Sequence, residues 1–288
     1  MTRAVLRVCV LSLVASSASA QSFPVQVRQN VNVKKDIAKP AFLMITFPDE
    51  KPAIYQVGVG LLANIPTGKQ SPLLTLSGLL DYQRNTAVSS QQDVLKAGFS
   101  GEWQMRAVDF VRRNNSGVVS FRTNFKTDRV KDTRGVQEAL YYTHAFFGRG
   151  RAPLPNRPWR PANNLFEIEY SPNVGLELDH VLDAANNGVT GTAARLLAQT
   201  NVALRPAPVD WDLRVELLVG GAYRYTANTT DIDSKRSHPL FTFEANYIPA
   251  RTPHAEVALG ATYVRGDDPD AGLEHQRYWQ LAVKLRVK

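Results

Sequence analysis

Apolar side chains recur at every second position in long segments of this chain, and this alternation constrains the fold more than any other feature. Between 95 and 106, apolar or small residues occupy the odd positions from Leu95 to Met105, and the residues between them are polar except for Gly98. The same pattern runs from Trp211 to Tyr225. A period of two places the two kinds of residue on opposite faces of a β-strand. The chain is therefore predicted to be all-β.

Twelve strands follow when the remaining sequence is interpreted in the same way. They are expected near 54–63, 73–84, 95–106, 118–127, 137–147, 164–170, 174–180, 192–205, 211–225, 239–248, 255–264 and 277–288. Two further apolar runs, 42–47 and Val25 to Val33, would raise the count to fourteen. We favour twelve strands.

The connections between these strands are expected to alternate in length in the C-terminal half. Short, proline-rich turns are predicted at 171–173, 206–209 and 249–253. Long polar loops are predicted at 148–163, 181–191, 226–238 and 265–276. The connections 85–93 and 128–136 fit less well, because they should be short turns and each has about nine residues.

The first twenty residues have the order of a secretory signal peptide. Arg3 and Arg7 precede an apolar run from Val8 to Ala15, and small residues follow up to Ala20. The alternative is a membrane anchor, but a spanning helix needs about 20 apolar residues. The single cysteine, Cys9, lies inside this segment, so the mature chain is expected to lack disulfides. Loss of Arg3 and Arg7 takes 34 basic residues to 32 against 26 acidic ones, a net charge of +6.

The alternation does not by itself say which face meets water. A soluble barrel or sandwich would bury the apolar set, and a membrane barrel would turn it toward lipid. The long runs favour the membrane, because about 9–11 tilted residues cross a bilayer. Large aromatic residues also gather toward the segment ends, as interfacial girdles do: Trp103, Tyr170, Trp211, Tyr223, Tyr225, Tyr247, Tyr263 and Trp279.

In this general pattern, residues 54–288 resemble the Gram-negative outer-membrane β-barrel proteins, porin-like in the broad sense. The resemblance implies an antiparallel, up-and-down transmembrane barrel located in the outer membrane. It also implies contact with membrane lipid and lipopolysaccharide. The expected organisation is a signal peptide at 1–20, a periplasmic extension or plug at 21–53 and the barrel at 54–288.

If the apolar set faces lipid, the alternate set lines a lumen that is rich in charge. The basic residues expected there are Lys96, Arg106, Arg122, Lys126, Arg195, Arg205, Arg214, Arg224, Lys284 and Arg286. The acidic residues are Asp81, Glu102, Glu167, Glu169, Glu177, Asp179, Asp212, Glu216, Glu244 and Glu256. Such a lumen is not suited to binding a hydrophobic ligand.

Two arrangements of these charges are open. A basic wall around Arg122 and Lys126 could face an acidic wall around Glu167 and Glu177 and set a field across a pore. Alternatively, the charges pair with one another and fill a closed barrel. The proline-rich loop at 148–163 could form an anion-favouring constriction or simply lie exposed; its arginines are Arg149, Arg151, Arg157 and Arg160.

No catalytic or cofactor motif is present, and no metal or nucleic-acid site is expected. None of the five histidines lies in a hydrolase or metalloprotease motif. Ser237, His238 and Asp233 share a predicted loop, which chance alone explains in a polar segment. The acidic tip from Asp267 to Glu274 departs from the calcium-loop pattern. We expect a passive channel for small polar or anionic solutes, or a structural membrane component; the alternatives are an outer-membrane hydrolase and a soluble secreted β-barrel binding protein.

Overall fold

A computed structural model of the chain describes its β-strands and some of the segments between them. The described residues are 25–28, 41–46, 54–65, 74–86, 91–105, 115–146, 152–163, 165–184, 189–206, 215–230, 235–251, 255–268 and 273–287. Within these ranges the secondary structure consists of strands and turns, without helices. No helix in this part of the chain is long and apolar enough to cross a membrane.

Thirteen strands are described. They are β1 (Val25–Arg28), β2 (Ala41–Thr46), β3 (Ile54–Ile65), β4 (Leu74–Asn85), β5 (Gln92–Gln104), β6 (Asn115–Asp128), β7 (Thr133–Phe146), β8 (Phe166–Ala184), β9 (Gly191–Pro206), β10 (Val215–Thr230), β11 (Ser237–Arg251), β12 (Ala255–Asp268) and β13 (Glu274–Val287). Most have 12 to 19 residues, well above the usual five or six of globular proteins.

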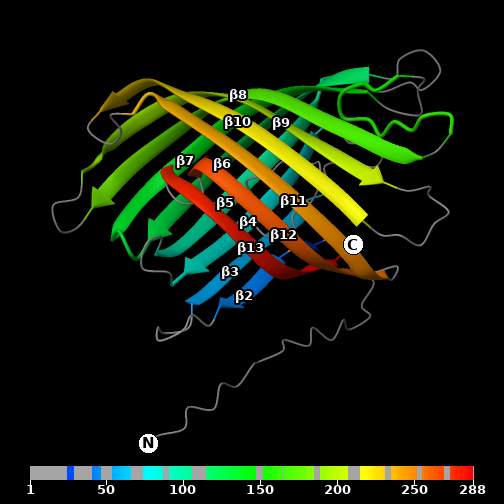
Figure 1. Cartoon of the computed structure of the whole chain (residues 1–288). Helices are drawn as coiled ribbons and strands as arrows, with labels where there is room; N and C mark the ends of the chain where they lie inside the picture. Colours follow the sequence, from blue (N-terminus) through cyan, green and yellow to red (C-terminus); the bar gives the residue numbers. More distant parts are fainter. Residues whose placement is uncertain are drawn as a thin grey trace, which may run out of the picture.

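The strands form a single antiparallel, up-and-down sheet. In the nine strands from β4 to β12, each one pairs with the next along the chain, and β13 pairs with β12. Figure 1 shows them as long ribbons that lie obliquely side by side in a curved wall. The prediction of an all-β, antiparallel up-and-down fold is confirmed for the described residues.

The first three strands add pairings at the two ends of this series. β2 pairs with β13 through Leu43 and Val283, and β3 pairs with β4 from Gln56 to Ile65. Both β1 and β2 pair with β3. β2 pairs with its segment from Ile54 to Gly58, and β1 pairs with its segment from Gly60 to Ala63. The apolar runs that could have raised the count to fourteen thus contain two short strands. The division of the chain at residue 53 stays a prediction.

The predicted turn at 171–173 is wrong, because β8 continues through it. Pro172 pairs with Thr200 of β9, and β8 extends without a break from Phe166 to Ala184. A proline lacks the N–H that a ladder on both sides requires, so it is tolerated at a strand edge. Pro172 lies at such an edge, since the pairing of β7 with β8 ends at Tyr142 and Val174. The strands predicted at 164–170 and 174–180 are therefore one strand.

Three of the four predicted long loops are also wrong in extent. β8, β10 and β12 continue to Ala184, Thr230 and Asp268, and so occupy the first part of 181–191, 226–238 and 265–276. In these segments the apolar alternation fades but the backbone ladder continues; Thr230, for example, pairs with Thr192. Backbone hydrogen bonding does not require apolar side chains, so the sequence pattern ended the strands too early.

The connection between β6 and β7 is a tight turn rather than nine residues. It comprises residues 129–132, and the Asp128 carboxylate accepts hydrogen bonds from the backbone N–H groups of Val130 and Lys131, at 3.0 and 3.1 Å. Asp132 has a positive φ of 48°. An aspartate that bonds to the backbone two residues later is typical of a turn, and Asp also tolerates the left-handed conformation.

Candidate functional site: the charged face of the sheet

The two faces of the sheet differ sharply in chemistry. On one face the side chains are buried and largely polar or charged; examples are Asp81, Lys96, Asn124, Glu216 and His238. We call it the charged face. The opposite face, which we call the apolar face, exposes large hydrophobic residues: Leu80, Phe99, Trp103, Phe125, Leu140, Tyr142, Val174, Leu176, Leu178, Leu196, Val219, Tyr223, Phe241, Tyr247, Leu259, Trp279 and Leu281.

Fourteen of the residues predicted to line a lumen are described, and all lie on the charged face. They are Asp81, Lys96, Glu102, Arg122, Lys126, Glu167, Glu169, Glu177, Asp179, Arg195, Arg205, Glu216, Arg224 and Glu244, as their strand registers show. Arg106, Asp212 and Arg214 lie outside the described residues. Lys284 and Arg286 belong to β13 and Glu256 to β12, but their side chains are not described. That these residues line a lumen stays a prediction.

One ion-pair network joins the beginning of β8 to β9 and β10. Arg205 contacts three carboxylates: Glu167 at 2.5 Å, Glu216 at 3.0 Å and Glu169 at 3.8 Å. Arg160, from the loop before β8, donates to the other oxygen of Glu167 at 2.6 Å. Guanidinium groups fit this role because their planar forks bind several carboxylate oxygens at once.

A second network lies further along β8. The Glu177 carboxylate accepts a hydrogen bond from Arg224 Nε at 2.8 Å and one from the Tyr141 hydroxyl at 3.0 Å. Arg122 donates to the same Tyr141 oxygen at 3.3 Å, and its guanidinium carbon lies 5.9 Å from the centre of the Tyr141 ring. Four strands, β6, β7, β8 and β10, thus meet in one set of polar contacts.

Two looser ion pairs lie elsewhere on this face. Lys96 lies 3.9 Å from Asp81, and Arg195 lies 3.7 Å from Asp179. Most of the acidic residues of β8 therefore have an arginine of β9 or β10 within ion-pair distance. The expected acidic wall is balanced by neighbouring positive charge, and Tyr141 links it to Arg122 of the expected basic wall.

The described part of the proline-rich loop is bound to the edge of β8. Trp159 and Ile168 exchange two backbone hydrogen bonds, and the backbone N–H of Asn156 donates to Tyr170 O. These contacts fill the edge of β8 that β7 leaves open beyond Val174. Arg157 is buried and donates to Ala152 O at 2.7 Å. Arg149 and Arg151 lie outside the described residues, and the constriction stays a prediction.

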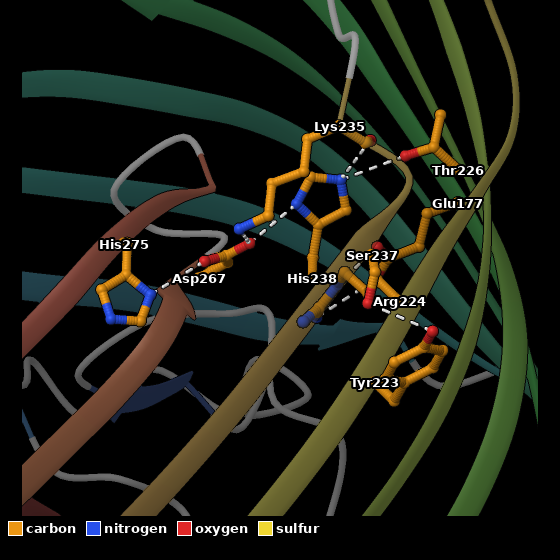
Figure 2. Close-up of polar contacts among 9 residues, drawn as sticks. All are labelled: Glu177, Tyr223, Arg224, Thr226, Lys235, Ser237, His238, Asp267 and His275. Atoms are coloured by element: carbon orange, nitrogen blue, oxygen red, sulfur yellow. Dashed lines mark hydrogen bonds and ion pairs between the residues drawn. The ribbon is translucent and has the colours of Figure 1, made fainter.

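A separate cluster lies where β10, β11, β12 and β13 approach one end of the sheet, and Figure 2 shows it. The Asp267 carboxylate has no exposed surface. One of its oxygens contacts His238 Nδ1 at 3.0 Å and the Lys235 ammonium, and the other contacts His275 Nδ1 at 3.2 Å. We call these four residues the Asp267 cluster.

Gly266 allows Asp267 to reach this position. Its φ is +125°, and a Cβ there would come within 2.1 Å of Pro239 O. Only glycine adopts this backbone without a severe clash. Burial alone would raise the pKa of the Asp267 carboxyl, but hydrogen bonds from Lys235, His275 and His238 outweigh it and hold the pKa below its ordinary value.

His238 has hydroxyl and carboxylate neighbours in the order of a hydrolase triad, but its contacts do not suit a general base. Its Nε2 lies 3.1 Å from the Thr226 hydroxyl and 3.0 Å from Lys235 O. A carbonyl oxygen only accepts hydrogen bonds, so Nε2 must carry a proton to bond with it. A base would need a free lone pair on that nitrogen to take the hydroxyl proton. The cluster is therefore better suited to holding strand ends together.

The sequence did not predict the Asp267 cluster. His238 was considered only with Ser237 and Asp233, but the Ser237 hydroxyl donates to the Tyr223 hydroxyl at 3.1 Å instead (Figure 2). Asp233 lies outside the described residues. Three of the cluster's members come from separate strands, Lys235 precedes β11, and the spacing follows no motif; the glycine directly before Asp267 was the one local signal.

Comparison with known proteins adds no assignment. No family model matches this chain, and neither the curated proteins nor the solved structures yield a significant match.

Proposed function

We propose that this protein is an outer-membrane β-barrel whose charged face lines a lumen and whose apolar face contacts lipid. In this proposal the chain is exported by its N-terminal leader. It acts as a passive channel for small polar or anionic solutes, or as a structural component of the membrane.

Closure into a barrel of twelve strands, β2 to β13, is supported by the pairings at the ends of the series. β13 pairs with β2, β2 with β3, and β3 with β4. β1 and β2 pair with successive segments of β3 on the same side, so together they occupy one position in the ring. A closed barrel has no unpaired strand edge, which hydrocarbon requires.

The observation that carries the proposal is the inverted burial of the sheet. Trp279 and Leu281 expose 68% and 75% of their surface, whereas Asp81 and Lys96 expose 0% and 2%. In water this arrangement would be unfavourable for two reasons: the apolar surface stays hydrated, and the charged groups are desolvated. In a bilayer the exposed apolar surface meets lipid, and the buried charges pair or meet water inside the barrel.

The channel is tested by reconstituting the full chain in a planar bilayer and recording conductance and its anion-to-cation ratio. We expect ion-selective steps, and the double variant Glu167→Lys/Glu169→Lys should shift selectivity further toward anions, since it adds positive charge on the charged face. Asp183→Lys is the control, because Asp183 is exposed on the apolar face next to the end of β8 and should leave selectivity unchanged.

Each outcome separates the parts of the proposal. Insertion without conductance would leave the structural role and overturn the channel. Equal selectivity shifts in the control and the double variant would mean that the charged face does not line the conducting path. A protein that remains monomeric in water without detergent would overturn the membrane location altogether.

A further inference from the structure

Two arginines lie directly opposite each other on the apolar face. Arg265 of β12 and Arg277 of β13 are cross-strand partners, and both side chains are exposed. Directly opposed residues of an antiparallel pair have their Cβ atoms about 4.5–5.5 Å apart, and like charges there destabilise the pair. The site therefore concentrates positive charge at an energetic disadvantage.

The described side chains around this arginine pair carry no negative charge toward it. Next to Arg265 on β11 lies the exposed ring of Phe241, and the next outward-facing residues along the strands are Tyr263 and Trp279. Among the described residues, neither guanidinium forms an ion pair. The nearby Asp267 carboxylate is turned away and bound by Lys235, His238 and His275.

Two other exposed arginines on the apolar face have a different kind of cross-strand partner. Arg84 of β4 lies opposite Asp93 of β5, and Arg134 of β7 lies opposite Asp183 of β8. Each thus has a carboxylate across the ladder. Arg265 and Arg277 instead face each other across the ladder, so an anion from outside the chain would relieve their repulsion.

The position of the arginine pair on the sheet indicates what kind of anion would bind there. Tyr263 and Trp279 contact each other with ring centres 4.9 Å apart, and Leu281 follows on β13. The face thus changes from aliphatic to aromatic to cationic toward the strand ends. A bilayer changes in the same order from hydrocarbon to interface to phosphate, and aromatic and arginine side chains occupy those levels.

We propose that Arg265 and Arg277 together bind the phosphate group of an anionic membrane lipid, whose acyl chains lie along Trp279 and Leu281. Two guanidinium groups offer paired N–H donors that match phosphate oxygens. This proposal rests on the proposed membrane location of the apolar face. It assigns this part of the barrel a defined lipid partner rather than general contact with the bilayer.

The test is lipid binding to the full chain in neutral-detergent micelles, measured by native mass spectrometry with phosphatidic acid as the probe. Phosphatidylcholine and inorganic phosphate are separate arms. We expect phosphatidic acid to bind best, and Arg265→Gln/Arg277→Gln to weaken it about tenfold or more, because charge-assisted hydrogen bonds to phosphate are lost. The double variant Arg84→Gln/Arg134→Gln removes the same charge from the same face and should change binding less than about twofold.

The remaining outcomes are decisive. Equal losses in the two double variants would overturn the site in favour of diffuse attraction. Binding of inorganic phosphate as strong as that of phosphatidic acid would overturn the lipid as ligand. Insertion into pure phosphatidylcholine vesicles is measured in parallel by flotation: a protein that inserts but has no lipid preference contradicts this inference alone, and one that never inserts contradicts the proposed function.

Discussion

The charged face and the apolar face share one hydrogen-bonded backbone but have opposite relations to solvent. On β8 and β9, Leu176 and Leu196 lie opposite each other on the apolar face and are about half exposed. One position further along β8, Glu177 faces the other way and binds Arg224. A water-soluble sheet would reverse these two roles. The difference shows that side-chain alternation alone decides which medium each face can accept.

The largest expected effect comes from placing charge on the apolar face. Leu176→Arg/Leu196→Arg puts two guanidinium groups in the middle of the proposed lipid-facing surface. We expect each to destabilise the inserted state by about 2–4 kcal/mol, as arginine does near the bilayer midplane of β-barrels. The measurement is the folded fraction after dilution from urea into phospholipid vesicles, followed by tryptophan fluorescence.

Val189→Arg is the control for this experiment. Val189 is just over half exposed and precedes β9, so it matches the leucines in exposure but lies outside the strands. It should fold into vesicles as the unaltered protein does. A double variant that becomes more soluble in water and keeps its fold would reverse the assignment of the two faces.

The two faces could be predicted from the sequence because the period of two is a local property. Lys96, for instance, is polar between Leu95 and Ala97, and this alone places it on the opposite face from them. The all-β fold and the grouping of the charges follow from that same pattern. Their pairing does not, because it depends on which strands are neighbours and in what register.

The errors arose where local signals conflict with longer-range contacts. Pro172 is a turn signal in the sequence, but an open strand edge tolerates it and Thr143 Oγ1 donates to its carbonyl oxygen at 2.5 Å. The strand ends near Thr230 and Asp268 lack apolar alternation, so only the neighbouring strands define them. The Asp267 cluster needs residues from separate strands, and no spacing rule connects them.

An intermediate effect is expected on the charged face, where Glu177→Gln keeps the shape of the side chain and removes its charge. Arg224 is buried and would lose its carboxylate partner, while Tyr141 would lose a charged acceptor. We expect a loss of about 2–3 kcal/mol in folded stability, because the buried hydrogen bonds from Arg224 and Tyr141 lose their charged acceptor. The measurement is the urea midpoint of the protein folded in vesicles.

Asp132→Asn is the matched control, since Asp132 is exposed in the turn between β6 and β7, Asn tolerates the same positive φ, and the change should cost less than about 0.5 kcal/mol. A double-mutant cycle with Arg224→Met isolates the pair: the two changes together should cost less than their sum. Strict additivity would show that Glu177 and Arg224 do not stabilise each other.

The smallest effect is expected at the Asp267 cluster. On β12 and β13 it lies closer to the strand ends than the exposed pair Arg265 and Arg277, and therefore outside the part of these strands that exposes hydrophobic side chains. Asp267→Asn keeps one acceptor oxygen and should cost about 1 kcal/mol, the usual net value of a hydrogen bond, since Lys235 is half exposed.

This contribution should depend on pH, because the folded-state pKa of Asp267 is lowered. The stability that the carboxylate contributes is complete above the unfolded-state pKa of about 3.9 and declines as the pH falls through the folded-state value. Urea midpoints of the two proteins should therefore differ by a constant amount above about pH 5 and converge in stronger acid. His238, His275 and Lys235 all face this carboxylate, so a difference that grew on acidification would contradict the assignment of this pH dependence to Asp267.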